Sequence, residues 1–443
     1  MSEPIRVAVV GSGPAGLYTA EELVKQGDVA IDVFDRLPAP YGLLRYGVAP
    51  DHLKMKTLET ALRRILDQPD VRFLGGVEVG VDVEPRELLD YYDAVVYAFG
   101  SGSDRRLGIP GEDLPGSFGA KDFVAWYCGH PDRLSQFVLD ARSAVVVGAG
   151  NVALDVARIL AKTSDELRAA TDMSDDVLDA LATSSISDIH LVARRGPAQA
   201  KFTTKELREL GELTNADVIV DPEQLQLSEA DQAVLAQDRV AKRNVEVLQS
   251  WIGRPLTGKP RRLHFHFRRV PIAAIGEDRL EAVALRRNEP DANPADQEVL
   301  PAQLLLRAVG YLGLGLPGVP FDSSACVIPN DKGRVLREGT PSAGEYAVGW
   351  IKRGPTGVIG TNKSDARETV ATMLADRSTL PTAPHRDPDA ILNLLRDRNV
   401  AVVTWAGWVA IEAAEMALGA AGGRNRVKIS DWAQLLAAAK SAD

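Results

Sequence analysis

Two glycine-rich dinucleotide fingerprints constrain the fold of this chain more than any other feature. They are GSGPAG at residues 11–16 and GAGNVA at residues 148–153, and each follows a run of β-branched residues. Their glycines permit a tight strand-to-helix turn and a close approach of the backbone to a pyrophosphate, which the N–H groups of the helix N-terminus bind. A single fingerprint is weak evidence, but two in this context predict a chain that couples two dinucleotides.

The segments around the fingerprints predict two βα units. Residues 5–10 (IRVAVV) are typical of a buried parallel strand and residues 14–26 of the following helix, and residues 144–147 (AVVV) and 151–162 repeat this arrangement. Further predicted elements are a strand at 31–34, a helix at 53–66 and a strand at 95–99. This alternation predicts a doubly wound α/β domain at the start of the chain.

The later segments predict a second domain and a return to the first. Glycine and proline at 107–115 (LGIPGEDLP) indicate a crossing, after which we expect a polar helical stretch at 164–181, a strand at 189–193 and added antiparallel strands at 262–267 and 280–286. A buried strand at 304–310 and a helix opened by 349–360 indicate the return. The tail, residues 387–443, is predicted to be helical, with Trp405 and Trp408 as packing residues.

Composition excludes several classes of function. The net charge of −10 disfavours nonspecific nucleic-acid binding, and no apolar run reaches the ~18 residues of a membrane span. Only residues 1–3 precede Pro4 and the first strand, so we expect no targeting segment and a cytoplasmic location. Cys128 and Cys326 lie 198 residues apart, which excludes a CxxC dithiol, an iron–sulfur ligand set and a zinc site. If the two dinucleotides exchange electrons, the chain must pass these electrons on without a dithiol relay.

The acid that ends the strand after the first fingerprint bears on the nucleotide bound there. Asp35 follows Gly11 by 24 residues, at a place where a carboxylate accepts hydrogen bonds from ribose hydroxyls and repels a 2′-phosphate. The first site therefore suits FAD or NAD. The alternative is that Asp35 merely begins a surface loop, because Asp is common at strand ends.

The corresponding strand after the second fingerprint ends in Arg194 and Arg195. Two forked guanidinium groups match a 2′-phosphate, so we expect this site to prefer NADPH over NADH. The pair follows Gly148 by 46 residues instead of the usual ~20, which we attribute to the polar insertion before the strand. The alternative is a solvated arginine pair without a ligand. Glu206 is expected to position an arginine, to contact a ribose hydroxyl or to form an exposed salt bridge.

Longer strings of the sequence resemble the adrenodoxin reductase family of NADPH-dependent ferredoxin reductases, and its bacterial members in particular. They are YGLLRYGVAPDH at 41–52, GAGNVALDVAR at 148–158, ARRGP at 193–197 and GWIKRGPTGVIG at 349–360, in the family's order over nearly the whole chain. The resemblance implies an α/β fold of two Rossmann-like dinucleotide-binding domains, with the NADP domain inserted in a discontinuous FAD domain. The implied FAD domain comprises residues 1–106 and 309–443, and the implied NADP domain comprises residues 107–308.

The fingerprints and the resemblance together give the expected cofactor contacts, and no metal ligands. For FAD, they are Gly11, Gly13, Pro14, Ala15, Gly16, Asp35, Gly42, Leu43, Val79, Trp350, Gly357, Val358 and Ile359. For NADP, they are Arg105, Gly148, Gly150, Asn151, Val152, Arg194, Arg195, Glu206 and Gly357. The family often has Glu where this chain has Asp35, so we expect a looser or water-mediated ribose contact.

The resemblance implies that electrons pass from NADPH through FAD to a ferredoxin, which supplies cytochromes P450 or other clients, and it leaves the direction of flux open. Hydride carries two electrons and an iron–sulfur partner accepts one at a time, so a flavin must stand between them. Residues 355–359 are expected to stabilise negative charge on the reduced flavin, and Gly357 to leave space for the nicotinamide. His52 and Asp155 match a His and an Asp near the flavin, and they are expected either to move protons or to be structural.

Two basic segments invite further interpretations. Arg208 is expected to help dock an acidic ferredoxin, with three weaker candidates and a solvated helix face as the alternative. Those weaker candidates are Arg239, Lys242 and Arg243. The segment RRLHFHFRR at 261–269 predicts a strand rather than a metal or nucleic-acid site, because two histidines do not close a metal site. The competing functions are an NADPH diaphorase, a flavin monooxygenase and a nonenzymatic NADPH-binding sensor.

Overall fold

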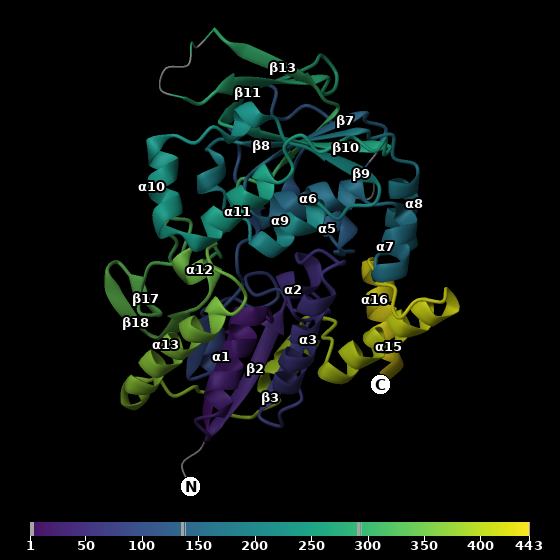
Figure 1. Ribbon diagram of the computed structural model, residues 1–443. Coiled ribbons are helices and arrows are strands. Elements are labelled where there is room, and N and C mark those ends of the chain that lie inside the picture. The colour runs from purple at the N-terminus through teal and green to yellow at the C-terminus, as the bar shows by residue number, and fades with distance from the viewer. Residues whose placement is uncertain (1–3, 134–136, 138, 290–292, 294, 443) are drawn as a thin grey trace. The chain divides into compact units, whose positions relative to one another are not determined.

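The chain folds into two compact α/β units, as shown in the computed structural model of Figure 1. The structure describes residues 4–133, 137, 139–289, 293 and 295–442. Unit 1 comprises Met1–Ser103 and Tyr311–Asp443, and unit 2 comprises Asp104–Gly310. The short strands β5 (Ser103–Asp104) and β15 (Tyr311–Leu312) occur where the chain passes from one unit to the other.

Unit 1 is built on a seven-stranded sheet with the order β16-β17-β18-β4-β1-β2-β3. The strands are β1 (Ile5–Val10), β2 (Val29–Asp35), β3 (Val71–Gly75), β4 (Ala94–Tyr97), β16 (Asn330–Asp331), β17 (Arg334–Arg337) and β18 (Thr340–Ala347). The first four are mutually parallel, and β18 pairs in parallel with β4 through Glu345 and Val95. A strand from late in the chain therefore completes a sheet begun at the N-terminus.

Both faces of this sheet are buried, which explains the unbroken apolar run in β1. Val7 and Val9 pack into one hydrophobic cluster, while Ala8 and Val10 pack into another. Parallel strands covered on both faces have this continuous apolar pattern. The helices of unit 1 are α1 (Pro14–Val24), α2 (Leu43–Tyr46), α3 (Leu53–Leu66), α4 (Leu88–Tyr91), α12 (Trp350–Arg353), α13 (Thr361–Ala375), α14 (Ala390–Asp397), α15 (Trp405–Ala421) and α16 (Trp432–Ala439).

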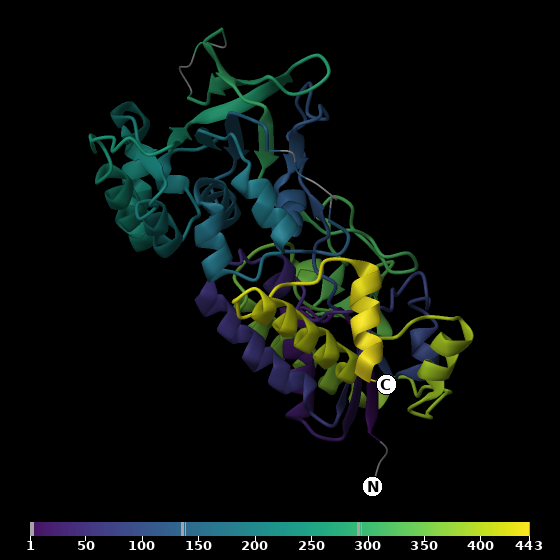
Figure 2. The ribbon, with the colours of Figure 1, turned by 90° about the vertical axis from the view of Figure 1, so that its right-hand side faces the viewer.

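The helical tail was predicted from its composition and is present. Trp408 is fully buried in the cluster that contains Val7 and Val9, and Trp405 packs against the same cluster, so both tryptophans are packing residues as expected. Figures 1 and 2 show α15 beside α3, and an Arg63–Glu412 ion pair joins these two helices. None of the helices that the structure describes has both the length and the apolar character needed to span a bilayer.

Unit 2 is built on a six-stranded parallel sheet with the order β6-β14-β7-β8-β10-β9. The strands are β6 (Ser117–Gly119), β7 (Ser143–Val147), β8 (Asp188–Ala193), β9 (Ala216–Ile219), β10 (Arg261–Phe267) and β14 (Leu304–Arg307). The helices are α5 (Ala120–Tyr127), α6 (Asn151–Ala161), α7 (Ser164–Ala170), α8 (Asp175–Ala182), α9 (Thr204–Leu210), α10 (Glu229–Gln237) and α11 (Arg239–Gln249). The expected pair of Rossmann-like folds is thus confirmed.

The prediction of antiparallel strands in this unit was half wrong. β10 pairs in parallel with both β8 and β9, so the segment 262–267 belongs to the main sheet. The antiparallel strands form a separate sheet of β11 (Arg269–Ile275), β12 (Ala282–Arg287) and β13 (Gln297–Pro301). The polar stretch at 164–181 is also divided, because α7 ends at Ala170 and α8 begins at Asp175.

Candidate dinucleotide-binding sites

The first glycine turn has the geometry of a pyrophosphate cradle. Gly11 has a φ of +114°, and a Cβ added there would lie 2.6 Å from the carbonyl oxygen of Ala98. A Cβ on Gly16 would lie 1.9 Å from the carbonyl oxygen of Gly11, so α1 can approach the turn only with glycine at this position. No side chain caps the N-terminus of α1, which begins with Pro14. Its first-turn N–H groups therefore remain for an anion such as a pyrophosphate.

Asp35, at the end of β2, organises this turn. Its Oδ2 accepts hydrogen bonds from the backbone N of Ser12 at 2.9 Å and from the Ser12 hydroxyl at 2.5 Å, while its Oδ1 accepts one from the N of Leu37 at 2.9 Å. Burial raises the pKa of Asp35, which the bonds from Ser12 and Leu37 oppose. Asp35 is therefore part of the turn rather than the start of a surface loop. Sequence reasoning did not foresee Ser12 as its partner.

A second segment of unit 1 lies against the same turn. Gly42 has a φ of +49°, and a Cβ added there would lie 3.0 Å from the Cα of Gly13. Leu43 follows as the first residue of α2. His52 is buried at the N-cap of α3, and Val79 is buried in the hydrophobic cluster that contains Val10.

The late segment 349–360 joins the turn from the other part of the chain. A Cβ on Gly349 would lie 2.5 Å from the Cβ of Ala15, so these two residues are in close contact. Asp365 accepts hydrogen bonds from the N of Gly349 at 2.7 Å and from the Nζ of Lys352 at 2.7 Å, which fixes the start of the segment. The indole of Trp350 donates to the carbonyl of Thr356 at 3.2 Å.

The end of this segment is exposed. Gly357 has a φ of +83°, and the apolar side chain of Val358 is 67% exposed, with half-buried Ile359 next to it. An exposed apolar residue beside an exposed glycine offers a surface on which a flat aromatic ring can lie. The structure thus brings the predicted residues Gly13, Ala15, Asp35 and Gly42 together at the first glycine turn, and it adds Gly349, which was not predicted.

The second glycine turn, in unit 2, is similar but more open. A Cβ on Gly148 would lie 2.4 Å from the carbonyl oxygen of Ala308, whereas one on Gly150 would have no neighbour within 4 Å. No side chain caps the N-terminus of α6, where Val152 is half-buried. The Oδ1 of Asn151 accepts a hydrogen bond from the backbone N of Thr203 at 2.8 Å, which ties α6 to the loop before α9.

Arg194 and Arg195 lie just beyond the end of β8, and both are exposed. Within the described part of the chain, neither guanidinium has a hydrogen-bond or ion-pair partner. Helices α7 and α8 lie between the glycine turn and β8, so they account for the long spacing seen in the sequence. Arg105 is also exposed, and its backbone N donates to the carbonyl of Gly310 at 2.9 Å. Cationic side chains with no protein partner suit a phosphate group.

Asp155 and Glu206 belong to one charge cluster around a residue that sequence reasoning missed. The guanidinium of Arg158 is 2.8 Å from Asp155, 3.7 Å from Glu206 and 3.8 Å from Glu209. Arg158 is only 1% exposed, so this cationic group is held within the unit. The sequence offered one indication that Arg158 belongs to the site, which is its position at the end of the string GNVALDVAR. The ion pair of Glu206 is therefore not an exposed salt bridge, because its partner Arg158 is buried.

The three histidines near β10 form their own contacts. The Nδ1 of His190 lies 2.9 Å from the Nε2 of His266, and the Nε2 of His264 lies 3.0 Å from the Oδ1 of Asp188. Burial, and next the nearby His264, lowers the pKa of His190 to about 3 and that of His266 to about 4. The alternation HFH is a strand, as expected, with its imidazoles half-buried on one face of the sheet.

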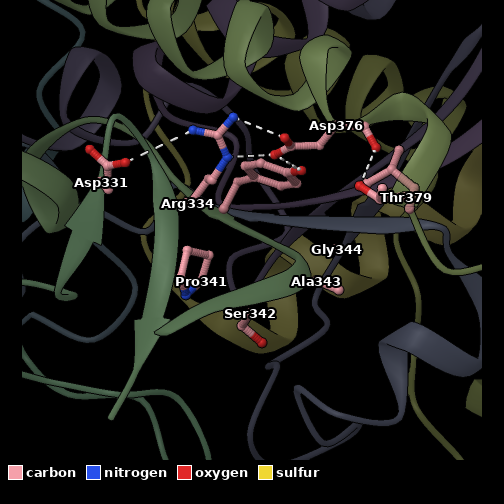
Figure 3. A pocket seen from close by; sticks show the side chains of 10 residues that line it. Asp331, Arg334, Pro341, Ser342, Ala343, Gly344, Asp376 and Thr379 are labelled. Atoms are coloured by element: carbon pink, nitrogen blue, oxygen red, sulfur yellow. Dashed lines mark hydrogen bonds and ion pairs between the residues drawn. The ribbon is translucent and has the colours of Figure 1, made fainter. Parts of the chain in front are cut away.

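A pocket of about 420 Å³ lies in unit 1, at the antiparallel edge of the sheet (Figure 3). It is lined by residues of β16 to β18 and by Asp376, Thr379 and Leu380, which follow α13. Its arginine, Arg334, is bound by Asp376 through two hydrogen bonds of 2.6 and 2.9 Å, and Tyr346 donates a third to the same carboxylate at 3.0 Å. The positive charge of this pocket is therefore already matched within the protein.

Comparisons with known proteins identify the family of the chain. Residues 5–223 match the family model described as pyridine nucleotide-disulphide oxidoreductase. The chain is similar to the NADPH-ferredoxin reductase FprA of Mycobacterium tuberculosis, with 44% identity over 98% of each chain. It is also similar to the mitochondrial NADPH:adrenodoxin oxidoreductase of Arabidopsis thaliana, with 38% identity over 99% of this chain and 96% of the relative. The solved structure of Mycobacterium tuberculosis FprA in complex with NADPH superposes with a TM-score of 0.92 at 43% identity, covering 99% of this chain and all of the other.

Proposed function

Because this chain belongs to the adrenodoxin reductase family of NADPH-ferredoxin reductases, we propose that it is an FAD enzyme that passes electrons from NADPH to a ferredoxin. One structural observation carries the proposal. Each unit has a glycine turn without a side-chain cap on its helix, and the neighbouring strands end in opposite charges, Asp35 in unit 1 and Arg194 with Arg195 in unit 2. Opposite charges at these two places favour two different dinucleotides.

FAD is proposed to bind unit 1. The residues of its glycine turn fit a pyrophosphate, because the turn packs so closely that a Cβ at Gly11 or Gly16 would collide with backbone, and no described side chain caps the N-terminus of α1. The carboxylate of Asp35 already accepts hydrogen bonds from Ser12 and Leu37. A ribose hydroxyl would therefore donate to a lone pair of this carboxylate that these two residues do not use. When bound, FAD supplies a carrier that takes an electron pair as hydride and gives electrons singly. The discontinuous FAD domain and the inserted NADP domain are proposed to correspond to units 1 and 2.

NADPH is proposed to bind unit 2. Its pyrophosphate would lie at the N-terminus of α6, beside Asn151, and Arg194 and Arg195 would bind the 2′-phosphate with their exposed guanidinium groups. Arg105 is a further exposed cation of the unit, and it is proposed to contact the coenzyme. Gly357 of unit 1, which is exposed and has no side chain, is proposed to leave room for the nicotinamide.

His52 and Asp155 are proposed to hold or move a proton. In support, His52 is buried at a helix N-cap, and Asp155 is held by Arg158 in an ion pair with little exposure to water. A carboxylate fixed by a buried guanidinium keeps one orientation, which a proton acceptor requires. Arg158 is then a positioning residue for both Asp155 and Glu206.

The ferredoxin is proposed to dock on α9 and α11 of unit 2, which pack together. Arg208 is exposed on α9, and Arg239, Lys242 and Arg243 are exposed on α11. An acidic iron–sulfur protein would be attracted by such a basic patch on an otherwise acidic chain. Cytochromes P450 are proposed as indirect clients, and a cytoplasmic location also remains a prediction.

Anaerobic titration of the purified protein tests the proposal. We expect a yellow protein whose flavin absorbance bleaches with about one equivalent of NADPH and returns when oxidised ferredoxin is added. Cytochrome c reduction should require ferredoxin. Reduction of dyes or quinones without any response to ferredoxin would favour a diaphorase, NADPH-driven oxygen uptake with a substrate would favour a monooxygenase, and binding of NADPH without bleaching would favour a sensor. A protein that binds no flavin would refute the proposal.

A further inference from the structure

The short helix α2 follows the residue that packs against the first glycine turn, but it has little stability of its own. It has four residues, Leu43–Tyr46, and follows Gly42, whose backbone packs against Gly13. A single helical turn gains too few hydrogen bonds to form alone in water. Something outside α2 must therefore hold it where it meets the turn.

Arg45 is the residue through which α2 is held. Its guanidinium is 2% exposed and donates hydrogen bonds of 2.5 and 3.3 Å to the carboxylate of Glu415 on α15. The same guanidinium lies 5.0 Å from the ring centres of both Tyr46 and Trp408. A buried guanidinium is tolerated only when its charge and donors are matched, so this pairing fixes the position of α2.

Glu415 is fixed in turn by the segment that follows α15. It is fully buried and accepts hydrogen bonds from the Nε of Arg426 at 2.7 Å and from the backbone N of Ile429 at 2.9 Å. Although burial opposes it, the charges of Arg45 and Arg426 hold the pKa of Glu415 below its ordinary value. Lys428 donates to the carbonyl of Arg45 at 2.8 Å, which adds a second tie between the C-terminal segment and α2.

We propose that Glu415 is a positioning residue for the flavin site, acting through Arg45 to hold α2 and Gly42 against the glycine turn. The proposal rests on the proposed binding of FAD to unit 1. It assigns the C-terminal helices a part in cofactor retention that their distance in the sequence, 370 residues from Arg45, conceals. Without the pair, α2 would move away from Gly13 and the turn would lose its shape.

The test measures the dissociation constant of FAD on apoprotein, by flavin fluorescence. We expect Glu415→Gln and Arg45→Lys each to raise this constant about tenfold or more, as loss of a charged partner in a buried pair does. The double variant should bind FAD no more weakly than the worse single variant, because both act on one contact. Glu415→Asp should restore part of the affinity. Binding of 2′,5′-ADP to unit 2 should stay unchanged in all of them.

Asp376→Asn is the matched control. It weakens another arginine–carboxylate pair of unit 1, that with Arg334 in Figure 3, at the end of α13 opposite to the segment 349–360. Thr361 and Asp376 are separated by the length of that helix, about 22 Å at the usual rise per residue. We expect the dissociation constant of FAD from the Asp376→Asn variant to remain within about twofold of that of the unmodified protein.

The measured FAD affinities decide whether Glu415 positions the flavin site. Unchanged FAD affinity in Glu415→Gln would overturn the inference, and so would equal losses in Glu415→Gln and Asp376→Asn, since that result indicates general destabilisation. Losses that multiply in the double variant would also overturn it. If Glu415→Gln does not fold, Arg45→Lys and Glu415→Asp give the same decision. Failure of the unmodified protein to bind FAD would refute the proposed function instead.

Discussion

Replacing Arg194 and Arg195 with alanine should change the choice of coenzyme more than anything else about the protein. Both side chains are exposed and have no protein partner within the described residues, so truncation should change the free energy of unfolding by no more than about 0.5 kcal/mol. Their only proposed role is to bind the 2′-phosphate that distinguishes NADPH from NADH.

The magnitude follows from the number and exposure of these groups. A hydrogen bond to a charged group contributes about 1.5–3 kcal/mol, and exposure favours the lower end of that range. Two arginines therefore give about 3 kcal/mol, or about a 150-fold increase in KM for NADPH. KM for NADH, which has no 2′-phosphate, should change less than about twofold.

The assay is ferricyanide reduction with either coenzyme at fixed ionic strength, because phosphate contacts weaken in salt. Arg286→Ala with Arg287→Ala is a matched control: these arginines are also adjacent and exposed in unit 2, at the end of β12. It should leave both KM values nearly unchanged. Equal increases for NADPH and NADH in the Arg194/Arg195 variant, or an equal loss in the control, would refute the assignment.

Three further predictions concern other parts of the molecule. His52→Gln should slow flavin reduction by NADPH in stopped flow, and an unchanged rate would remove the proposed proton role. Arg208→Glu should weaken ferredoxin binding, and the affinity of the parent should fall as salt rises; an affinity independent of salt would refute electrostatic docking. Burial lowers the pKa of His190 and His266 to about 3 and about 4, below the unfolded value of about 6.5. Below about pH 6.5 the unfolded chain therefore binds protons that the folded unit does not, and the free energy of unfolding should fall by up to about 1.4 kcal/mol per pH unit for each histidine. Urea unfolding between pH 7 and pH 4.5 measures this decline, which should be shallower after His190→Gln with His266→Gln; equal slopes would contradict it.

Elements around the fingerprints were predictable because their signals are local. The strand at 5–10 is present with the expected bounds, and the helix at 151–162 ends one residue early. Membership of the adrenodoxin reductase family, expected from four longer strings, is confirmed by relatives that match over the full length.

The pairing of β10 was not predictable from its alternating pattern. Alternation usually marks an antiparallel strand with one wet face, yet β10 is parallel, and its alternation arises because His264 and His266 are half-buried on one face while Phe265 and Phe267 are buried on the other. The alternating pattern correctly predicted that one face of the strand is more exposed than the other. It contains no information on whether the neighbouring strand runs parallel or antiparallel.

Partners of buried charges were also beyond reach of the sequence. Arg158 and Asp155 are three residues apart on one helix and were within one quoted string, but Glu206 joins them from a different helix. Arg45 and Glu415 are 370 residues apart, and no periodicity connects them. Such pairs depend on how the elements pack, which a single sequence does not state.

The parallel pairing of β18 with β4 has a consequence for synthesis of the protein. All of β4 has been synthesised once residue 97 has left the ribosome. The strand that pairs with its edge, β18, begins only at residue 340. At about 5–20 residues per second, the backbone N–H and C=O groups on one side of β4 would stay unpaired for about 10 to 50 seconds, a state in which chains are prone to misassemble. Premature termination between residues 310 and 340 would release a polypeptide in which unit 2 is complete and the sheet of unit 1 lacks the strand that pairs with β4.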